Sequence, residues 1–272
     1  EIRNKSIQDR LGENPAIVVG RHATIEQVPF VREELVFHDS MQSTQAWQQA
    51  VEVDNGYITG ETGADSKGFY PRLFGAGVEP GAWQGPSLQR GIGTSLQDFR
   101  ADIRIENFNT AAEMGMMAVY FRDSNNNKIA NIGFGDAWLN HTENFGHAQL
   151  GHYDSGPRVD AYADYPYGWN DFDGIMRIER VNNVWRFYYA QIMKDGTHNW
   201  VHSKGRIVDS SRAYMAPINR IQVAFRLWYG AERTDMHIKD IKLYRINKEP
   251  QLGNSVPYLA QVGDQIQAHT KT

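Results

Sequence analysis

Along most of the chain, short runs of β-branched and aromatic residues are separated by clusters of Gly, Asn and Asp. The clearest run spans residues 99–108, where apolar side chains at every second position alternate with Arg100, Asp102, Arg104 and Glu106. A period of two places these two sets on opposite faces of a β-strand. The pattern therefore predicts a half-buried strand with one charged face.

Two pairs of such runs are joined by turn-forming residues. Residues 114–122 and 128–134 flank the sequence Asp-Ser-Asn-Asn-Asn, and residues 175–180 and 184–189 flank Val-Asn-Asn. Asn and Asp favour turns because their side chains hydrogen-bond to the nearby backbone and because they tolerate left-handed backbone angles. Each pair of runs is therefore expected to form a β-hairpin.

Similar runs recur through residues 35–246, and together they indicate eleven or more strands with almost no helix signal. This number exceeds an immunoglobulin-type domain and fits an all-β fold, a two-sheet antiparallel jelly-roll β-sandwich. No window approaches the ~20 apolar residues of a membrane-spanning helix, so no membrane partner is expected. The remaining runs are residues 35–38, 57–59, 72–74, 83–88, 200–207, 218–229 and 237–246.

The two ends of the chain lack this texture. Residues 1–33 carry Gly, Pro and charged residues without a sustained period, so we expect a linker or an extended N-terminal arm. Residues 34–247 are expected to form the jelly roll, and residues 248–272 a C-terminal linker. Because the sequence starts with Glu1 and its last strand-like run stops abruptly, we expect a mature or excised fragment.

The composition argues against several functions. The 272 residues contain 28 Lys and Arg against 32 Asp and Glu, a formal net charge of −4. A nucleic-acid-binding protein normally carries a basic stripe, so nucleic acid is not expected as a partner. The absence of cysteine from the sequence excludes disulfides, zinc ribbons and thiol nucleophiles.

The segment 134–173 departs from the rest of the chain. It holds nine aromatic residues but only three large aliphatic ones, together with seven acidic residues and three histidines, which is not how a core is expected to be built. Aromatic planes stack on the C–H faces of sugars, while carboxylates and amides bind sugar hydroxyls. We therefore interpret the segment as a long carbohydrate-binding loop; alternatively, its aromatic residues only pin the loop to the sheet. The stacking candidates are Trp138, Tyr153, Tyr165, Tyr167 and Trp169, and the hydroxyl-binding candidates are His152, Asp160 and Asp164.

A catalytic function is not expected. Glycoside hydrolases need two carboxyl groups ~5–9 Å apart, and no run carries the Glu-x-Asp-x-x-Glu pattern with which jelly-roll glucanases present them. The nearest pairs, Glu61 with Asp65 and Asp171 with Asp173, lie in turn-like sequence where solvation explains them. The motifs of serine hydrolases, P-loop nucleotide binders and zinc proteases are absent as well.

Two sets of residues, three histidines and a pair of aspartates, are candidates for metal binding. His141, His147 and His152 are spaced by six and five residues, which suits no single helical face, so hydrogen-bonding or exposed histidines are favoured over metal ligands. Asp39 follows the first predicted strand and Asp240 lies in the last one. We expect that these two carboxylates could meet and hold a structural calcium ion.

Four of the five tryptophans outside the aromatic segment are expected to be buried, because they lie in or beside predicted strands and have apolar neighbours. We expect Trp47, Trp83, Trp185 and Trp228 in the core, although Trp228, at a strand end, also suits the mouth of a groove. Tyr120 is likewise expected to pack rather than to bind a ligand.

Three stretches together resemble one protein family. Residues 37–40 (Phe-His-Asp-Ser) precede Trp47, residues 83–88 read Trp-Gln-Gly-Pro-Ser-Leu, and residues 238–244 read Ile-Lys-Asp-Ile-Lys-Leu-Tyr. They are similar to the jelly-roll carbohydrate-binding module that is inserted in the evolved distal tail proteins of siphophages of Gram-positive bacteria. Including the flanking segments, the resemblance covers residues 16–272.

The resemblance implies more than the fold, which would be of the concanavalin and carbohydrate-binding-module type. Residues 19–30 and 256–264 look like the segments that join this module to the tail-hub scaffold. A place at the tail tip of a virion is implied, with other tail or baseplate proteins as partners and adhesion to host cell-wall polysaccharide without cleavage. The parent could also be a related tail-associated protein. Two alternatives stay open: a structural tail spacer that binds no glycan, and a jelly-roll glycoside hydrolase.

Overall fold

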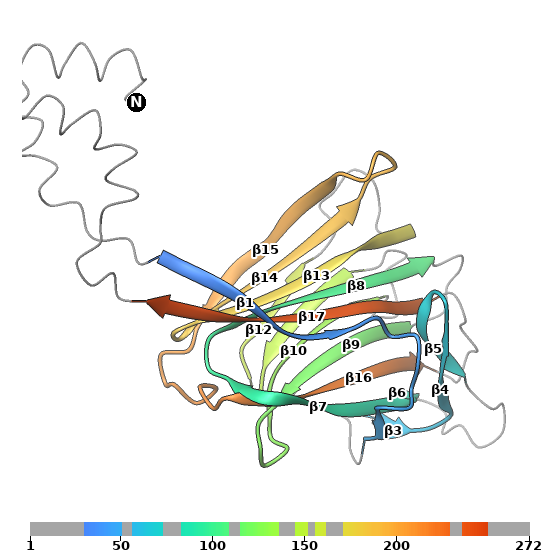
Figure 1. Cartoon of the computed structure of the whole chain (residues 1–272). Helices are drawn as coiled ribbons and strands as arrows, with labels where there is room; N and C mark the ends of the chain where they lie inside the picture. Colours follow the sequence, from blue (N-terminus) through green and yellow to red (C-terminus); the bar gives the residue numbers. More distant parts are fainter. Residues whose placement is uncertain are drawn as a thin grey trace, which may run out of the picture. The chain divides into compact units, whose positions relative to one another are not determined.

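The computed structural model describes residues 30–50, 56–72, 83–108, 115–135, 145–151, 156–161, 171–228 and 236–249. The chain divides into two compact units, one made of Glu33–Ile246 and the other of Glu1–Arg32 with Asn247–Thr272. All regular elements of the described residues are strands (Figure 1), which confirms the predicted all-β fold. The described part of the chain holds no helix long and apolar enough to cross a membrane.

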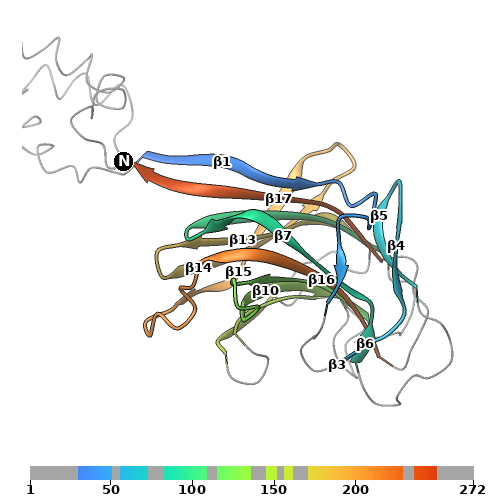
Figure 2. The ribbon, with the colours of Figure 1, turned by 60° about the horizontal axis from the view of Figure 1, so that its bottom comes forward.

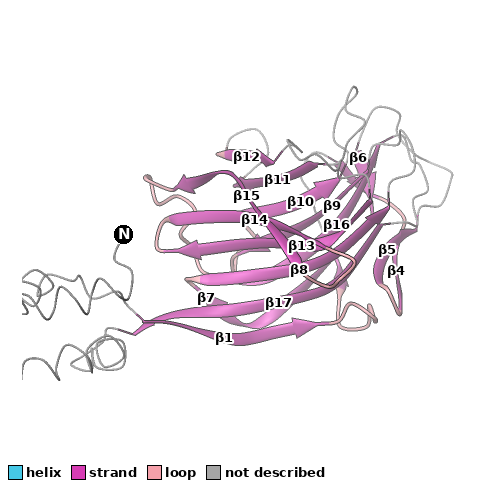
Figure 3. Cartoon of the chain, turned by 90° about the horizontal axis from the view of Figure 1, so that it is seen from above, coloured by secondary structure: helices cyan, strands magenta, loops and turns pink. Residues whose placement is uncertain are grey.

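Sheet A has eight strands, and its strands β14, β13, β8 and β17 run side by side in Figure 3. All neighbouring strands from β15 to β4 pair antiparallel, and β1 runs along β17 (Figure 2). In spatial order the strands are β15 (His198–Val208), β14 (Val184–Ile192), β13 (Asp171–Val181), β8 (Phe99–Phe108), β17 (Met236–Glu249), β5 (Gly68–Arg72) and β4 (Glu61–Asp65), with β1 (Phe30–Asp39) on β17.

Sheet B has nine strands, and together the two sheets form the predicted jelly-roll sandwich. In spatial order the strands are β12 (Arg158–Ala161), β11 (Phe145–Leu150), β10 (Lys128–Gly135), β9 (Gly115–Arg122), β16 (Ile218–Trp228), β6 (Trp83–Gly85) and β3 (Gly56–Ile58); β7 (Ser87–Leu96) also pairs with β16, and β2 (Gln48–Gln49) pairs with β7. The pair β3 and β6 is parallel, a departure from the antiparallel prediction. It is possible because the chain between these strands is long enough for a crossover.

Both predicted hairpins are confirmed, β9 with β10 and β13 with β14. Their turns contain Asn126 and Asn182, whose φ angles of 68° and 56° are left-handed, a conformation that Asn tolerates. The single strand predicted at 83–88 is instead broken at Pro86 into β6 and β7. Proline has no N–H to donate to the ladder, so the continuous pairing is interrupted there.

The aromatic segment 134–173 is not one long irregular loop, which corrects the sequence interpretation. Part of it forms β11 and β12, which extend sheet B beyond β10. At its ends, Phe134 and Phe172 are buried and stack in the core with ring centroids 4.2 Å apart. The strands were missed because β11 is rich in small and polar residues rather than the β-branched residues that mark strands.

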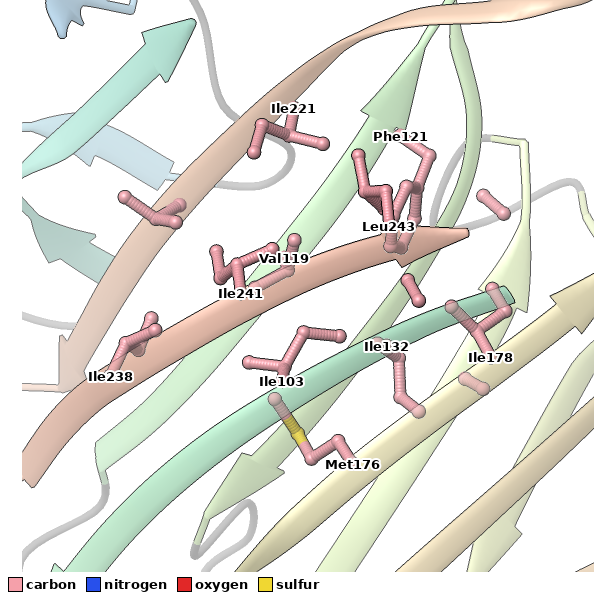
Figure 4. Packing of buried hydrophobic residues seen from close by; sticks show 14 of the residues in the cluster. Ile103, Val119, Phe121, Ile132, Met176, Ile178, Ile221, Ile238, Ile241 and Leu243 are labelled. Carbon is pink, nitrogen blue, oxygen red and sulfur yellow. The ribbon is translucent and has the colours of Figure 1, made fainter. Parts of the chain in front are cut away.

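The core lies between the two sheets. Figure 4 shows Ile103, Met176 and Leu243 from sheet A packed with Val119 and Ile132 from sheet B. The predicted burial of two tryptophans is confirmed, with Trp47 exposed to 6% and Trp185 to 0%. The other two, Trp83 and Trp228, are opposite each other in the β6 and β16 pairing, and their side chains lie outside the described ones.

Candidate functional site

The central strands of sheet B bury side chains on both of their faces. In β9, Val119 and Phe121 belong to the core, as do Ile221 and Val223 in β16. Because successive side chains of a strand point to opposite faces, the residues between them lie on the face turned away from the core. We call this the outer face of sheet B. A second, separate buried cluster lies on it, formed by Ala118, Tyr120 and Ala224.

Six residues on this face stand directly opposite one another across six strands, and five of them carry side-chain amides. With strands ~4.8 Å apart, the five steps between the six strands span about 24 Å. Because an amide offers both donors and an acceptor, the arrangement is a linear series of hydrogen-bonding groups perpendicular to the strands. We call it the amide row: Gln149, Asn131, Tyr120, Gln222, Gln89 and Gln48, from β11, β10, β9, β16, β7 and β2.

The next row along the strands consists mostly of small side chains. Its opposed residues are His147, Gly133, Ala118, Ala224 and Ser87. A Cβ at position 133 would lie 2.2 Å from Cε1 of His147, so a glycine is needed there for the histidine ring to fit. Over β9, β16 and β7, this row leaves little side-chain bulk beside the amide row.

On the other side of the amide row, three cations stand opposite one another. Lys128 pairs in register with Arg122, and Arg122 with Arg220. We call these three residues the cation row. Between the two rows, the Tyr120 ring centroid lies 5.3 Å from Nζ of Lys128 and 6.0 Å from Cζ of Arg122, and Tyr120 Oη accepts a 3.4 Å hydrogen bond from Arg226 Nη2.

Part of the amide row is held rigidly by a buried hydrogen-bond chain. Arg122 Nε donates to Gln222 Oε1 at 2.5 Å, Gln222 Nε2 donates to Ser87 Oγ at 2.8 Å, and Ser87 Oγ donates to the carbonyl of Val223 at 2.9 Å. These contacts fix the orientation of the Gln222 amide, because its oxygen and its nitrogen are bound to different partners.

Other amide groups of the row have unused hydrogen-bonding atoms. Asn131 Oδ1 and Gln89 Oε1 are both buried and accept no hydrogen bond from the described residues. Buried polar atoms are nearly always paired, since leaving one unpaired costs about 1–3 kcal/mol. Unpaired acceptors within a built polar row are therefore candidates for contact with a ligand.

Burial also controls the charge of two groups on this face. It lowers the pKa of Lys128 to about 7, and the nearby Arg226 contributes to that lowering. Burial lowers the pKa of His147 to about 3, with further contributions from Arg158 and Lys128, so His147 is neutral at physiological pH. His147 is only 7% exposed, which excludes the exposed position that the sequence left open for it.

Nearly all residues that the sequence analysis predicts to bind sugar lie outside the described part of the chain. Asp160 belongs to β12, where it stands opposite His147, but its side chain is outside the described ones. The nominated residues outside the described ranges are Trp138, His152, Tyr153, Asp164, Tyr165, Tyr167 and Trp169. Their role in sugar binding stays a prediction.

Sequence reasoning missed the amide row, because its members are spread from position 48 to position 222. One signal was nevertheless present in β16, where Gln222 and Arg226 alternate with apolar residues in a strand that is buried on both faces. The expectation that Tyr120 packs is confirmed by its burial, but it packs on the outer face and not in the core.

Both carboxylates of the predicted calcium site already have protein partners. Asp39 accepts hydrogen bonds from Trp47 Nε1 at 3.0 Å and from the guanidinium of Arg90. Asp240 lies 2.6 Å from Nε2 of His38. Within the described ranges, no three His, Asp or Glu residues gather as metal ligands do. Calcium binding stays a prediction.

The carboxylate pairs considered for catalysis lie in strands, not in turns. Glu61 and Asp65 are exposed at the two ends of β4, and Asp65 Oδ1 accepts a hydrogen bond from the backbone N–H of Lys67. In β13, Asp173 accepts hydrogen bonds from Arg104 at 2.5 and 2.9 Å across sheet A. The side chain of Asp171 is outside the described ones. Neither pair belongs to the rows on the outer face of sheet B.

No protein-family model and no curated protein matches this sequence. Solved structures do resemble the fold. The CBM2 module of the evolved Dit of Lactobacillus casei BL23 phage J-1 matches with a TM-score of 0.64 and 15% identity, over 80% of this chain and 98% of that one. SCLam, a non-specific endo-β-1,3(4)-glucanase of family GH16, matches with a TM-score of 0.51 and 10% identity, over 81% and 96%. A tetrameric galectin from the sponge Cinachyrella matches with a TM-score of 0.41 and 10% identity, over 58% and 99%.

Proposed function

We propose that this chain is a non-catalytic carbohydrate-binding module of a phage tail-tip protein, and that it recognises a polysaccharide of the host cell wall. The amide row carries the proposal. A row of amides across six strands suits an extended chain of sugar units, because amides offer acceptors and donors to hydroxyls. Gln222 is already bound by Arg122 and Ser87. The proposed contacts therefore fall on the other amides, Asn131 and Gln89 above all. The adjoining row adds little side-chain bulk beside these amides over β9, β16 and β7, and its own residues are buried.

The aromatic segment would complete this site. Residues 136–144 connect β10 to β11, and residues 162–170 connect β12 to β13, so both connections start from strands of sheet B. We place the stacking rings of Trp138, Tyr165, Tyr167 and Trp169 in these connections. Aromatic planes would then supply contact area while the amide row supplies hydrogen bonds.

A hydrolase is the alternative that the likeness to a family GH16 glucanase favours. Against it, the described side chains of the amide, small-residue and cation rows include no carboxylate, whereas a glycosidase needs two near the scissile bond. We therefore propose binding without cleavage. The third possibility, a structural spacer, gives no reason for buried amide acceptors that lack donors among the described residues.

The phage assignment is supported by the match to the module from phage J-1, which this chain covers over 98% of its length. We propose a location at the tail tip, with other tail or baseplate proteins as partners. An open sugar site buries little area, so the affinity of one copy should be weak. Several copies on a symmetric tail would increase binding through their effective concentration.

The test is labelling of intact Gram-positive cells with a fluorescent fusion of the whole chain, competed with purified wall polysaccharide and monitored for release of reducing ends. Labelling that polysaccharide competes away, with no release, is the expected result. Release of reducing ends would establish the hydrolase instead. A failure to label any plausible host would favour the structural spacer.

Two variants locate the site. Asn131→Ala removes one unpaired amide of the row, and the double variant Trp169→Ala, Tyr167→Ala removes two proposed stacking rings. Both should weaken labelling while the melting temperature stays near that of the parent. The matched control is Trp200→Ala, which removes a ring from sheet A, where it lies 4.1 Å from the Arg177 guanidinium. Unchanged labelling by folded forms of both test variants would refute the site.

A further inference from the structure

A pocket of about 160 Å³ lies where the amide row reaches the edge strands β7 and β2. Gln89 and Gln48 are the last two members of the amide row, and Arg220, opposite Gly91, is the last member of the cation row. The two rows therefore end side by side in one cavity. Its lining consists of Ala46, Gln48, Gln89, Arg90, Gly91 and Arg220.

Arg220 is the cation of this pocket that could bind an anion. Its guanidinium has no hydrogen bond or ion pair with the described residues, and its opposite neighbour in β9 is another cation, Arg122. Like charges directly opposite each other in a sheet destabilise it, and a bound anion would relieve that repulsion. The second arginine of the lining, Arg90, is already paired with Asp39 and lies over the Phe37 ring.

One residue of the lining, Gln89, also has an acceptor that lacks a donor among the described side chains. Gln89 Oε1 is buried and accepts no hydrogen bond from the described residues. A fully deprotonated anion such as sulfate would leave this atom unpaired, because it offers only acceptors. A ligand that satisfies both Arg220 and Gln89 carries a negative group together with a hydrogen-bond donor, and the hydroxyl of an acidic sugar is such a donor.

The outer face of sheet A is different. There the cations face carboxylates: Arg177 donates to both oxygens of Asp102 at 2.6 and 2.9 Å, and Lys239 lies 3.1 Å from Glu106. Charges paired in this way give a face with little net attraction for an anion. Among the described side chains, the excess of positive charge is therefore a local property of the rows on sheet B.

We propose that this pocket is an anion subsite at one end of the glycan site, and that the polysaccharide bound by the chain is acidic, with a phosphate or carboxylate placed against Arg220 and a neighbouring hydroxyl donating to Gln89. The inference rests on the proposed function, because it names the class of polysaccharide that the amide row would hold.

The experiment uses the fluorescent fusion on intact Gram-positive cells, with three soluble competitors: poly(glycerol phosphate), polygalacturonate and the neutral glucan laminarin. The variant Arg220→Gln replaces the guanidinium by a neutral amide. Its control, Arg186→Gln, removes the same charge from the outer face of sheet A. Melting temperatures verify that both variants fold.

We expect Arg220→Gln to weaken labelling about tenfold, which corresponds to ~1.4 kcal/mol, and Arg186→Gln to leave it unchanged. An acidic polymer should compete better than laminarin, and higher salt should weaken labelling less in Arg220→Gln than in the parent. The better of the two acidic polymers identifies the group as phosphate or carboxylate.

Equal labelling by Arg220→Gln and the parent would overturn the anion subsite while the proposed function stands. Competition by laminarin alone would overturn it as well. If the parent labels no cells, the proposed function and the subsite both fail, so the two failures are distinguishable.

Discussion

Arg180 is a buried cation, and its removal should lower the free energy of unfolding by a clearly measurable amount. Its side chain is 0% exposed and lies between the rings of Phe99 and Trp185, whose centroids are 5.3 and 5.1 Å from its Cζ. All of its hydrogen bonds go to backbone carbonyls, two of them at residues 96–97, where β7 ends, and two in the segment 214–216 after β15. Nε donates to Gln97 at 2.5 Å, Nη2 to Leu96 at 2.8 Å, and Nη1 to Tyr214 at 3.1 Å and Ala216 at 2.9 Å.

The magnitude follows from two opposing contributions. Burial lowers the pKa of Arg180 to about 10, and a lowering of this size corresponds to about 3 kcal/mol against the charged form. Four hydrogen bonds from a charged donor, at ~1.5 kcal/mol each, stabilise by about 6 kcal/mol. The difference, about 3 kcal/mol in favour of the native side chain, is the expected loss in Arg180→Met, where the apolar stem is kept and the donors are not.

The assay is urea unfolding followed by circular dichroism on the whole chain. Arg180→Met should lower the free energy of unfolding by about 3 kcal/mol. Arg180→Lys should lower it by less, because an ammonium keeps the charge, but some loss remains because it lacks the planar fork of donors. The control is Arg104→Met, which breaks a partly exposed ion pair with Asp173 and should cost under ~1 kcal/mol. If Arg180→Met costs no more than this control, the reasoning is refuted.

Three further predictions concern stability. Burial lowers the pKa of His147 below its unfolded value, so the folded protein is fully stable with respect to this group above pH ~6.5, and the free energy of unfolding falls by about 1.4 kcal/mol per pH unit as the pH falls toward 3. Unfolding of His147→Gln should lack this part of the acid dependence. An unchanged dependence contradicts the prediction. Gly133→Ala should destabilise by about 2–3 kcal/mol, because its Cβ would collide with the His147 ring, whereas Gly91→Ala, with its nearest atom 4.0 Å away, should be near neutral in thermal unfolding; equal effects would refute the steric argument. A calcium ion held by Asp39 and Asp240 predicts a lower melting temperature after chelation, and an unshifted transition in calorimetry removes the idea.

Local sequence determined the features that depend on neighbours in the chain. The period of two in residues 99–108 predicted β8 with its bounds, because alternate burial is a property of the strand itself. The two hairpins were predictable for a similar reason, since Asn126 and Asn182 adopt left-handed angles that the turns require. In residues 175–180, which form part of β13, a period of two places Arg180 on the same side as the buried Met176 and Ile178, but it says nothing about the carbonyls that Arg180 binds.

The amide row and the pocket at its end were decided by tertiary structure alone. Gln48, Asn131 and Gln222 become neighbours in one row only because the strand order of sheet B brings β2, β10 and β16 into register. Each residue taken by itself reads as an ordinary polar position in a strand. Pairing between strands far apart in the chain depends on loop closure and on packing of the whole core, so no local pattern contains it.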